Sequence, residues 1–373
     1  MITRPARVAI VSDPLVQRGG AERCVEALAE AFPDAPVFAI LYSPERGPAS
    51  IADRVIPSFL QRIPNAAHRH RAFLPLYPAA VESFDLSEYD IIISSHHTVA
   101  KGLLRRSDQM HLCYCHTPMR ALWVRPHDEL EKLPAVARPF AAALTGRMRV
   151  WDYVTAARVD QFIANSSTTQ SRIAKHYGRE SIIVPPPIDV ERFTPAGEAS
   201  DYYLIASRNV PYKRLDIAVA ATGLLGRRLV IVGTAGDDES ADAAHVDRRG
   251  HVSDEQLVDL MRGARALLFP QYEDFGMTPV EMMACGRPVV AFAAGGALDT
   301  VVDGVTGILV PEQTPQAFAS AMLRLEQTMF SPDRLRRHAL GFSKARFVST
   351  MRSMVESAQD ETAPRISAAS SPR

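Results

Sequence analysis

The sequence lacks a charge imbalance and is poor in cysteine. Lys and Arg together number 42, as do Asp and Glu, so the composition argues against a general nucleic-acid binder. The four cysteines have no metal-ligand spacing, and Cys113 and Cys115, two residues apart on an apolar run, are expected to share one strand face. We therefore expect buried, reduced thiols and a cytosolic protein.

Membrane spans, targeting signals, repeats and metal motifs are missing as well. No run of about 18 apolar residues is present, so we expect no transmembrane helix. The N-terminal residues pass directly into a β-branched run at 7–12, so we expect no signal peptide. No Asp-x-Asp motif stands at the end of a predicted strand, and Asp237 and Asp238 do not fit a calcium loop. We therefore expect no metal and no other cofactor.

What the sequence does contain is a regular alternation of strand and helix patterns. Apolar, β-branched runs predict strands at residues 7–12, 37–42, 91–94 and 111–115, with helical segments between them. This alternation is typical of an α/β domain with a doubly wound sheet. A length of 373 residues suggests two such domains.

A cluster of three prolines marks the predicted boundary between the domains. The run SIIVPPP ends at residue 187, and a new series of strands and helices begins with YYLIASR. We place the first domain at 1–187 and the second at 188–341. Residues 342–358 have the amphipathic spacing of a last helix, and the Ser-, Ala- and Pro-rich residues 359–373 are expected to be disordered.

The most informative segment, residues 269–290, has the pattern of a strand, a polar loop, a helix and a second strand. Thr278 is placed as the N-cap of the helix, Pro279 as its first residue, and Glu281 three residues after the cap. Backbone N–H groups at such a helix start suit an anionic ligand, because they lack partners and the helix dipole is positive there. On this pattern alone, Glu281 could equally complete a capping box, and Glu273 could be a solvated loop acid.

Other polar residues occupy loops that follow predicted strands. Gly19 and Gly20 open a helix after the first strand, and His116 stands at the carboxyl end of a later strand, where open α/β sheets place their ligands. Arg208 and Lys213 flank the loop that opens the second domain. Taken singly, each has a plain alternative: a tight turn for the glycines, a structural role for the histidine, and solvation for the two cations.

Several motifs together give a family resemblance that covers the chain from Val8 to about Val355. EDFGMTPVE, followed by MACGRPVV, resembles the Glu-x7-Glu element of the retaining family-4 glycosyltransferases of the GT-B fold. GHVS resembles the family's Gly-x-Val-Ser segment, and CHTPMR is similar to a subgroup of mostly GDP-mannose-dependent mannosyltransferases. The resemblance implies an α/β architecture of two Rossmann-like domains facing a central cleft. The first would bind the acceptor, the second the nucleotide sugar, and the last helix would cross back to the first.

The resemblance also implies roles for individual residues. His116 would lie beside the transferred sugar, and Glu273 would face its hydroxyl groups. Arg208 and Lys213 would contact the donor diphosphate, because without a metal the leaving group needs fixed cations. These four residues form the expected catalytic set. The residues expected to contact the donor are Gly19, Gly20, Arg208, Lys213, Val252, Glu273, Phe275, Gly276, Met277, Thr278 and Glu281.

The implied reaction is the transfer of a hexose from a nucleotide sugar, with retention of configuration. The acceptor would be a glycan or lipid-linked saccharide, as in exopolysaccharide or O-antigen assembly. GDP-mannose is the leading donor, and a UDP-sugar is the alternative because the loop TAGDDES stands where the family usually carries Gly-x-Gly-Pro. Two other classes stay open: a nucleotide-sugar-binding relative without transferase activity, and a GT-B epimerase.

A basic segment bears on where such an enzyme would work. Residues 54–78 contain no acid, and Arg54, Arg62, Arg69 and Arg71 are interleaved there with apolar residues. One interpretation is a connecting segment with a solvated basic face. The other is peripheral contact of a cytosolic enzyme with anionic lipid at the inner face of the cell membrane.

Overall fold

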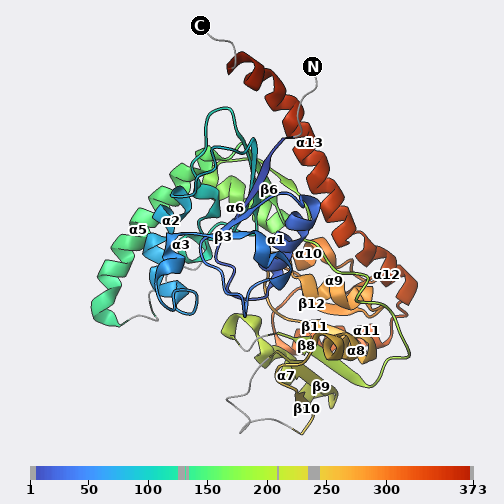
Figure 1. Ribbon diagram of the computed structural model, residues 1–373. Helices are drawn as coiled ribbons and strands as arrows, with labels where there is room; N and C mark the ends of the chain where they lie inside the picture. The colour runs from blue at the N-terminus through green and yellow to red at the C-terminus, as the bar shows by residue number, and fades with distance from the viewer. Residues whose placement is uncertain (1–5, 125–130, 132–133, 208–209, 234–243, 370–373) are drawn as a thin grey trace. The chain divides into compact units, whose positions relative to one another are not determined.

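The computed structural model describes residues 6–124, 131, 134–207, 210–233 and 244–369, with side chains as far as residue 359. The chain divides into two compact units (Figure 1). Unit 1 comprises Met1–Pro187 and Phe347–Arg373, and unit 2 comprises Ile188–Arg346. No helix within the described ranges is long and apolar enough to cross a membrane.

Unit 1 is built on a seven-stranded parallel sheet. Its strands are β1 (Val8–Ser12), β2 (Val37–Ala39), β3 (Val55–Pro57), β4 (Ile91–His96), β5 (Met110–Cys115), β6 (Gln161–Ala164) and β7 (Ser181–Ile183). They lie in the order β3-β2-β1-β4-β5-β6-β7. The direction of winding changes between β1 and β4, so the carboxyl ends of these two strands form the topological switch point of the sheet.

Alternate residues of the central strands pack on opposite faces of this sheet. Ile10 of β1 lies in one hydrophobic cluster, whereas its neighbours Ala9 and Val11 lie in another. Cys113 and Cys115 share a face, as their spacing predicts, and all four cysteines are buried and free. Because both faces are covered, the strands appear in the sequence as continuous apolar runs.

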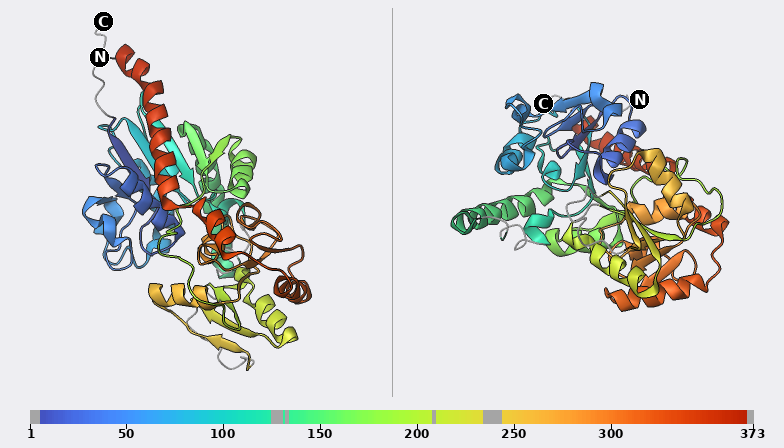
Figure 2. Two further views of the ribbon diagram at one scale, coloured as in Figure 1. Left: turned by 90° about the vertical axis from the view of Figure 1, so that its right-hand side faces the viewer. Right: turned by 90° about the horizontal axis from the view of Figure 1, so that it is seen from below.

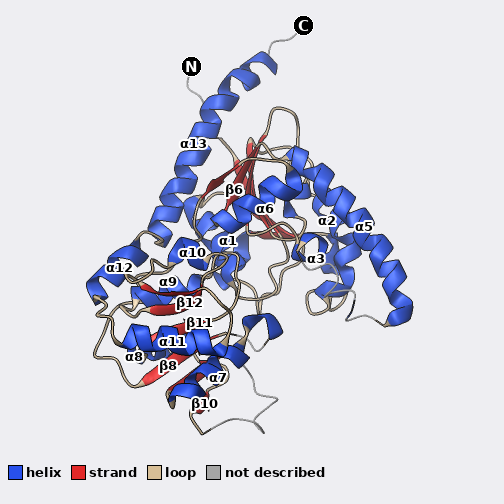
Figure 3. Cartoon of the chain, turned by 180° about the vertical axis from the view of Figure 1, so that it is seen from behind, coloured by secondary structure: helices blue, strands red, loops and turns tan. Residues whose placement is uncertain are grey.

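Helices and 3-10 turns cover both faces of the unit 1 sheet (Figures 2 and 3). The α-helices of the first 187 residues are α1 (Gly20–Ala31), α2 (Tyr77–Glu82), α3 (Arg120–Trp123), α5 (Arg138–Thr155) and α6 (Ser167–Tyr177). The 3-10 turns are η1 (Ala49–Arg54), η2 (Phe59–Arg62), η3 (His70–Leu76), η4 (Ala100–Gly102), η5 (Ala135–Ala137) and η6 (Ala156–Arg158). Local chemistry sets the ends of α6, because the Ser166 hydroxyl accepts the Thr169 N–H at 3.1 Å and Gly178 follows with a φ of 63°.

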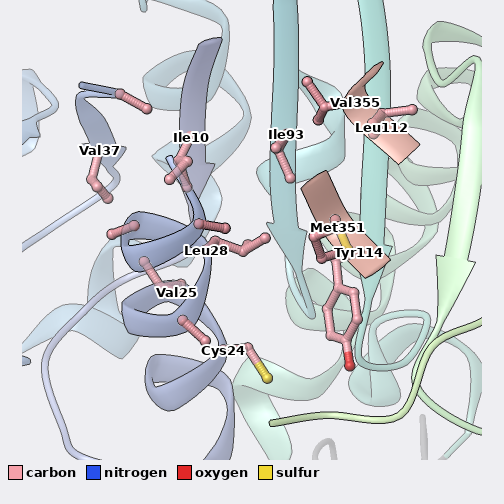
Figure 4. Close-up of a cluster of buried hydrophobic side chains, with 14 of the residues drawn as sticks. Ile10, Cys24, Val25, Leu28, Val37, Ile93, Leu112, Tyr114, Met351 and Val355 are labelled. Carbon is pink, nitrogen blue, oxygen red and sulfur yellow. The ribbon is translucent and has the colours of Figure 1, made fainter. Parts of the chain in front are cut away.

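The chain returns to unit 1 through α13 (Lys344–Ala369). Met351 and Val355 of this helix are buried in the same cluster as Ile10 and Leu28 (Figure 4). The sequence predicts disorder from residue 359, whereas the helix continues through residues 359–369. A helix that is already nucleated gains one backbone hydrogen bond for each added residue, so the packed turns extend it past the point where composition indicates disorder.

Unit 2 contains a six-stranded parallel sheet. Its strands are β8 (Tyr202–Ala206), β9 (Arg228–Val232), β10 (Val246–Arg248), β11 (Ala266–Phe269), β12 (Val289–Phe292) and β13 (Gly307–Val310). Their order is β10-β9-β8-β11-β12-β13, which places the switch point between β8 and β11. The helices and the 3-10 turn of unit 2 are η7 (Pro211–Lys213), α7 (Leu215–Leu225), α8 (Asp254–Gly263), α9 (Met277–Ala284), α10 (Ala297–Thr300), α11 (Pro315–Glu326) and α12 (Pro332–Leu340).

Candidate functional site

Helix α9 begins at the end of the loop that follows β11. Its N-cap is Gly276, whose φ of 81° lies in the left-handed region that glycine adopts readily. A Cβ at Gly276 would lie only 2.8 Å from Cζ of Phe269. The prediction that Thr278 caps this helix is wrong, because the chain already enters the helix at Met277, through the glycine turn, and Thr278 is the second helical residue.

Glu281 lies in the middle of α9 and is buried, with 5% of its surface exposed. Since Thr278 is inside the helix, the capping box between Thr278 and Glu281, which was the alternative interpretation of Glu281, does not form. Gly276, as the N-cap of α9, has no side chain with which to cap the helix, and Pro279 has no N–H to satisfy. The positive end of the helix dipole at this start would favour an anion.

Two of the four expected catalytic residues are in direct contact. Lys213 ends η7, Glu273 lies in the loop between β11 and α9, and the Lys213 ammonium forms an ion pair with the Glu273 carboxylate. The loops meet because β8 and β11 are neighbours in the sheet. Each side chain is 16% exposed, so the pair is shielded from water yet open to a ligand. A third member of the set, Arg208, lies outside the described residues.

A glycine pair holds the Glu273 loop in place. The Gly296 N–H donates to the Glu273 carbonyl at 2.9 Å. A Cβ at Gly296 would lie 2.2 Å from Cα of Phe275, and a Cβ at Gly295 would lie 2.3 Å from the Glu273 oxygen. The sequence indicates only a turn at this pair. In the folded chain, the absence of side chains at both glycines allows two loops to pack in close contact.

Other residues expected at the donor site contribute mainly to packing. Phe275 is buried, and its ring centroid lies 5.8 Å from that of Phe342. Val252 and Met277 are half-buried and pack against the same hydrophobic cluster. Any donor contact of these residues would therefore come chiefly from their backbone. The TAGDDES loop falls within residues 234–243, outside the described part of the chain.

His116 follows β5 in unit 1 as an uncharged imidazole. Its Nε2 lies 2.9 Å from the Ser95 hydroxyl, and the Thr169 hydroxyl donates to its backbone carbonyl at 3.0 Å. Burial, and to a lesser extent the neighbouring His97, lowers the pKa of His116 to about 3. At neutral pH this ring can therefore form hydrogen bonds with a ligand but carries no positive charge.

Gly19 is the N-cap of α1 and Gly20 its first residue. A Cβ at Gly19 would lie 2.9 Å from Oε2 of Glu22, a buried acid that the sequence analysis did not select. Burial raises the pKa of Glu22. In the sequence, Glu22 appears only as an acid in the first turn of a predicted helix. An acid in that position is more often an exposed capping residue, so its burial could not be predicted.

Asp13 and His97 are two further polar residues that the sequence analysis missed. Asp13 follows β1 and is fully buried, whereas His97 follows β4 and its side chain is 36% exposed. His97 Nδ1 lies 3.3 Å from Oδ2 of Asp13, and the rings of His97 and His116 are 6.1 Å apart. Only the order of the strands shows that β1 and β4 are neighbours, so sequence spacing could not reveal this pair.

The basic segment 54–78 divides into buried and exposed parts. Arg54 donates to carbonyl groups at the end of α1, at Ala29, Phe32 and Pro33, so it caps that helix. Leu60 and Tyr77 are buried, while Phe73 and Leu74 pack against the same core. The residues that stay exposed include Arg62, Arg69, Arg71, Phe59, Ile63 and Leu76.

Family models match both units. Residues 18–192 match the model described as Glycosyltransferase Family 4, and residues 201–328 match the model described as Glycosyl transferases group 1. Both matching models describe glycosyltransferases. The first match contains Gly19, Gly20 and His116, and the second contains Lys213, Glu273 and the start of α9.

Curated relatives of the chain include proteins named D-inositol 3-phosphate glycosyltransferase. The D-inositol 3-phosphate glycosyltransferase of Geodermatophilus obscurus is 31% identical over 248 residues, which cover 56% of this chain and 54% of the relative. The enzyme of that name from Kineococcus radiotolerans is 30% identical over 261 residues, covering 58% of this chain and 59% of the relative. The chain thus spans about half the length of the curated relatives it matches.

Solved structures share the fold. HepE of Anabaena in complex with UDP has a TM-score of 0.68 at 18% identity, covering 94% of this chain and 100% of that one. Sucrose-phosphate synthase of Thermosynechococcus elongatus has a TM-score of 0.68 at 19% identity, covering 95% and 100%. The predicted α/β fold is confirmed: the two sheets are the Rossmann-like domains of the GT-B fold.

Proposed function

We propose that this chain is a retaining glycosyltransferase that moves a hexose from a nucleotide sugar to a hydroxyl group of a glycan or lipid-linked saccharide. The observation that carries the proposal is the ion pair between Lys213 and Glu273 in the loops beside the start of α9, which begins at a glycine N-cap. A cation and a helix dipole suit a diphosphate, and a carboxylate suits sugar hydroxyls. One region of unit 2 thus offers groups for both halves of a nucleotide sugar.

In this proposal the donor diphosphate replaces Glu273 as the ion-pair partner of the Lys213 ammonium. The ammonium then stabilises the negative charge that develops as the nucleoside diphosphate leaves, and Glu273 accepts hydrogen bonds from the hexose hydroxyls. Following the family resemblance, Arg208 supplies a second cation and Glu281 binds the ribose. These fixed charges would do the work that a metal ion does in other transferases.

Front-face attack would account for retention. The family motifs in this chain supply no carboxylate as a nucleophile at the anomeric carbon, so the acceptor hydroxyl would attack from the side of the leaving group. The bond from the anomeric carbon to the phosphate oxygen breaks as the new glycosidic bond forms, and that phosphate oxygen takes the acceptor proton. The neutral His116 would steady the sugar. Trapping of a covalent glycosyl-enzyme would contradict this route.

Two donors have specific support. The CHTPMR motif favours GDP-mannose. A UDP-sugar is favoured by the fold neighbour HepE, which has been solved with UDP-glucose. The acceptor would be a saccharide on a growing glycan or lipid carrier, and the relatives named for D-inositol 3-phosphate add a cyclitol phosphate to the acceptors worth testing.

Thermal shift against GDP, UDP, ADP and their hexose conjugates tests the proposal. The matching nucleotide should raise the unfolding temperature of the wild type, and its effect should shrink in Lys213→Ala. The matching nucleotide sugar should then be hydrolysed slowly without an acceptor. Binding without hydrolysis or transfer would favour a non-transferase relative, and epimerisation of the bound sugar would favour the epimerase alternative. An absence of binding to every nucleotide would refute the proposed function.

We further propose that the enzyme works on the cytosolic side of a membrane through reversible contact with anionic lipid. Arg62, Arg69 and Arg71 are exposed, and so are the apolar side chains of Phe59 and Leu76 in the same segment. At about 1 kcal/mol for each basic residue near an anionic surface, three arginines would give weak, salt-sensitive binding.

Vesicle sedimentation at low salt tests this contact. The wild type should bind vesicles that contain anionic lipid and should dissociate as salt rises. Changing Arg62, Arg69 and Arg71 together to Ser should abolish binding. A matched control, which removes the same charge from unit 2, is Arg334, Arg337 and Arg346 to Ser, all exposed in the wild type. Equal loss in both triple variants would show that only net charge matters, and no binding by the wild type would leave the segment as a connector.

A further inference from the structure

The switch point of unit 1 carries a pair of residues, Asp13 and His97, that the proposed reaction does not use. Open α/β sheets bind ligands at such points, just beyond the carboxyl ends of the strands. Asp13 stands beyond β1 and His97 beyond β4, the two strands that flank the switch. The burial and contacts of this pair indicate what kind of ligand could bind there.

Asp13 takes the place that an anionic ligand would occupy at this edge. Its carboxylate accepts the backbone N–H groups of His97 and Thr98 at 2.7 Å each, of Val99 at 2.8 Å and of Ala100 at 3.1 Å. In α/β proteins that bind phosphate, the backbone N–H groups that follow a strand donate hydrogen bonds to the ligand. Here they already bind a buried carboxylate of the protein, whose charge would repel a phosphate. The site therefore suits a neutral ligand.

His97 is held so that one edge of its ring faces outward. Nδ1 is buried 3.3 Å from the Asp13 carboxylate, close enough for electrostatic attraction but without a hydrogen bond. The side chain is 36% exposed, so its exposed surface lies away from Nδ1, toward the edge that carries Nε2. In the part of the chain that the structure describes, no hydrogen bond to Nε2 is formed. The negative charge of Asp13 near Nδ1 favours the tautomer with the ring proton on Nδ1. In this tautomer Nε2 presents a lone pair that can accept a hydrogen bond from a hydroxyl group.

The surroundings of His97 also suit a sugar. The ring of His116, which is neutral, lies 6.1 Å from that of His97 at an interplanar angle of 74°. Glu22, in the first turn of α1, is close enough for electrostatic attraction to His97 and is itself buried. A ligand at Nε2 would thus meet uncharged or acidic neighbours, which accept hydrogen bonds from hydroxyl groups and disfavour phosphate.

We propose that His97, oriented by Asp13, binds a hydroxyl group of the acceptor through Nε2. The identification of this ligand as the acceptor rests on the proposed function, because the donor diphosphate is assigned to unit 2. The chemical class, a neutral polyol and not a phosphate, follows from the contacts of Asp13 and His97 alone. His97 is thereby a substrate-binding residue for the group that attacks the anomeric carbon.

Histidine-ring NMR tests the ligand class without any need for activity. The signal of His97 is assigned by its loss in His97→Gln, and the wild type is titrated with methyl α-mannoside, with myo-inositol and with inorganic phosphate. A saturable shift of the His97 signal with either polyol, together with little change with phosphate, supports the proposal. No shift with either polyol, or an equal shift with phosphate, overturns it. Neither result depends on whether a nucleotide binds to unit 2, so failure of the proposed function would be recognised separately.

Kinetics then test the role in the reaction. In His97→Ala, transfer to methyl α-mannoside should fall about tenfold, the effect of one lost hydrogen bond, with donor hydrolysis and the donor KM unchanged. His97→Gln should restore part of the rate, because its amide oxygen can accept the same hydrogen bond. The matched control is His176→Ala, a half-exposed histidine on α6 of the same unit. If His97→Ala behaves like this control, His97 does not bind the acceptor.

Discussion

Substituting Gly296 by Ala should show whether the glycine pair positions the Glu273 loop. The φ of Gly296 is −65°, which any residue adopts, so the substitution brings no backbone strain. The new Cβ, however, would lie 2.2 Å from both Cα and O of Phe275. Since carbon atoms pack at about 3.5 Å, the loop must retreat by roughly 1 Å. The same movement would weaken the hydrogen bond from Gly296 to the Glu273 carbonyl.

The expected cost has two parts. Overpacking in a closed contact costs about 1–3 kcal/mol, and the weakened hydrogen bond adds about 1 kcal/mol, so unfolding should become easier by roughly 2–4 kcal/mol. Because Glu273 moves with the loop, turnover should fall by up to about a hundredfold, as a 1 Å misplacement of a catalytic group does. Chemical denaturation measures the first effect, and donor hydrolysis under conditions where the variant is folded measures the second.

Gly146→Ala is the matched control for this substitution. Gly146 lies inside α5, and a Cβ there would have no atom within 4 Å. Alanine should therefore stabilise the protein by about 0.5–1 kcal/mol through its helix propensity and leave turnover unchanged. If Gly296→Ala unfolds and turns over like the wild type, the loop is not held by this contact and the reasoning from close approach is refuted.

Three further predictions concern single side chains. Lys213→Ala should lower turnover at least about a hundredfold through loss of a transition-state cation while the protein stays folded, and wild-type kinetics would contradict the diphosphate assignment. Glu281→Gln should mainly weaken nucleotide binding and Glu273→Gln should mainly lower kcat, as calorimetry and kinetics can show; the opposite pattern would exchange their roles. Burial lowers the pKa of His111 to about 3 in the folded protein, against about 6.5 in the unfolded chain. The stabilisation from this neutral ring is therefore complete above pH 6.5 or so. As the pH falls from there toward 3, the free energy of unfolding should decrease by about 1.4 kcal/mol per pH unit. In His111→Gln the acid-side fall of the unfolding free energy should be shallower, and an unchanged slope would show that this ring is not the group that titrates.

The hydrogen bonds of His111 show which neutral form of the ring the fold holds. Nδ1 lies 3.1 Å from the Arg158 carbonyl, which can only accept, so Nδ1 carries the proton. Nε2 then accepts from the Ser94 hydroxyl at 2.8 Å. A second proton on the ring would place a positive charge inside the sheet, which burial disfavours, so acid should destabilise the protein.

Local chemistry let the sequence determine much of the fold. β-branched runs predicted the buried strands, Ser166 and Gly178 set the ends of α6, and the spacing of Cys113 and Cys115 placed them on one face. These features depend on neighbours a few residues apart in the chain, so their physical causes are visible in the sequence. One element with equally local signals was overlooked: α12 starts with Ser331 as N-cap and a proline at its first position.

Tertiary structure decided the details of the site. Thr278 has good capping chemistry, but the approach of Gly276 to Phe269 starts α9 before it. Lys213 and Glu273, 60 residues apart, form a pair because β8 and β11 lie side by side. Asp13 reaches N–H groups 84 to 87 residues away because β1 adjoins β4. Strand order and burial are properties of the whole packed chain, and from them follow the partners of these charges and the low pKa of His116.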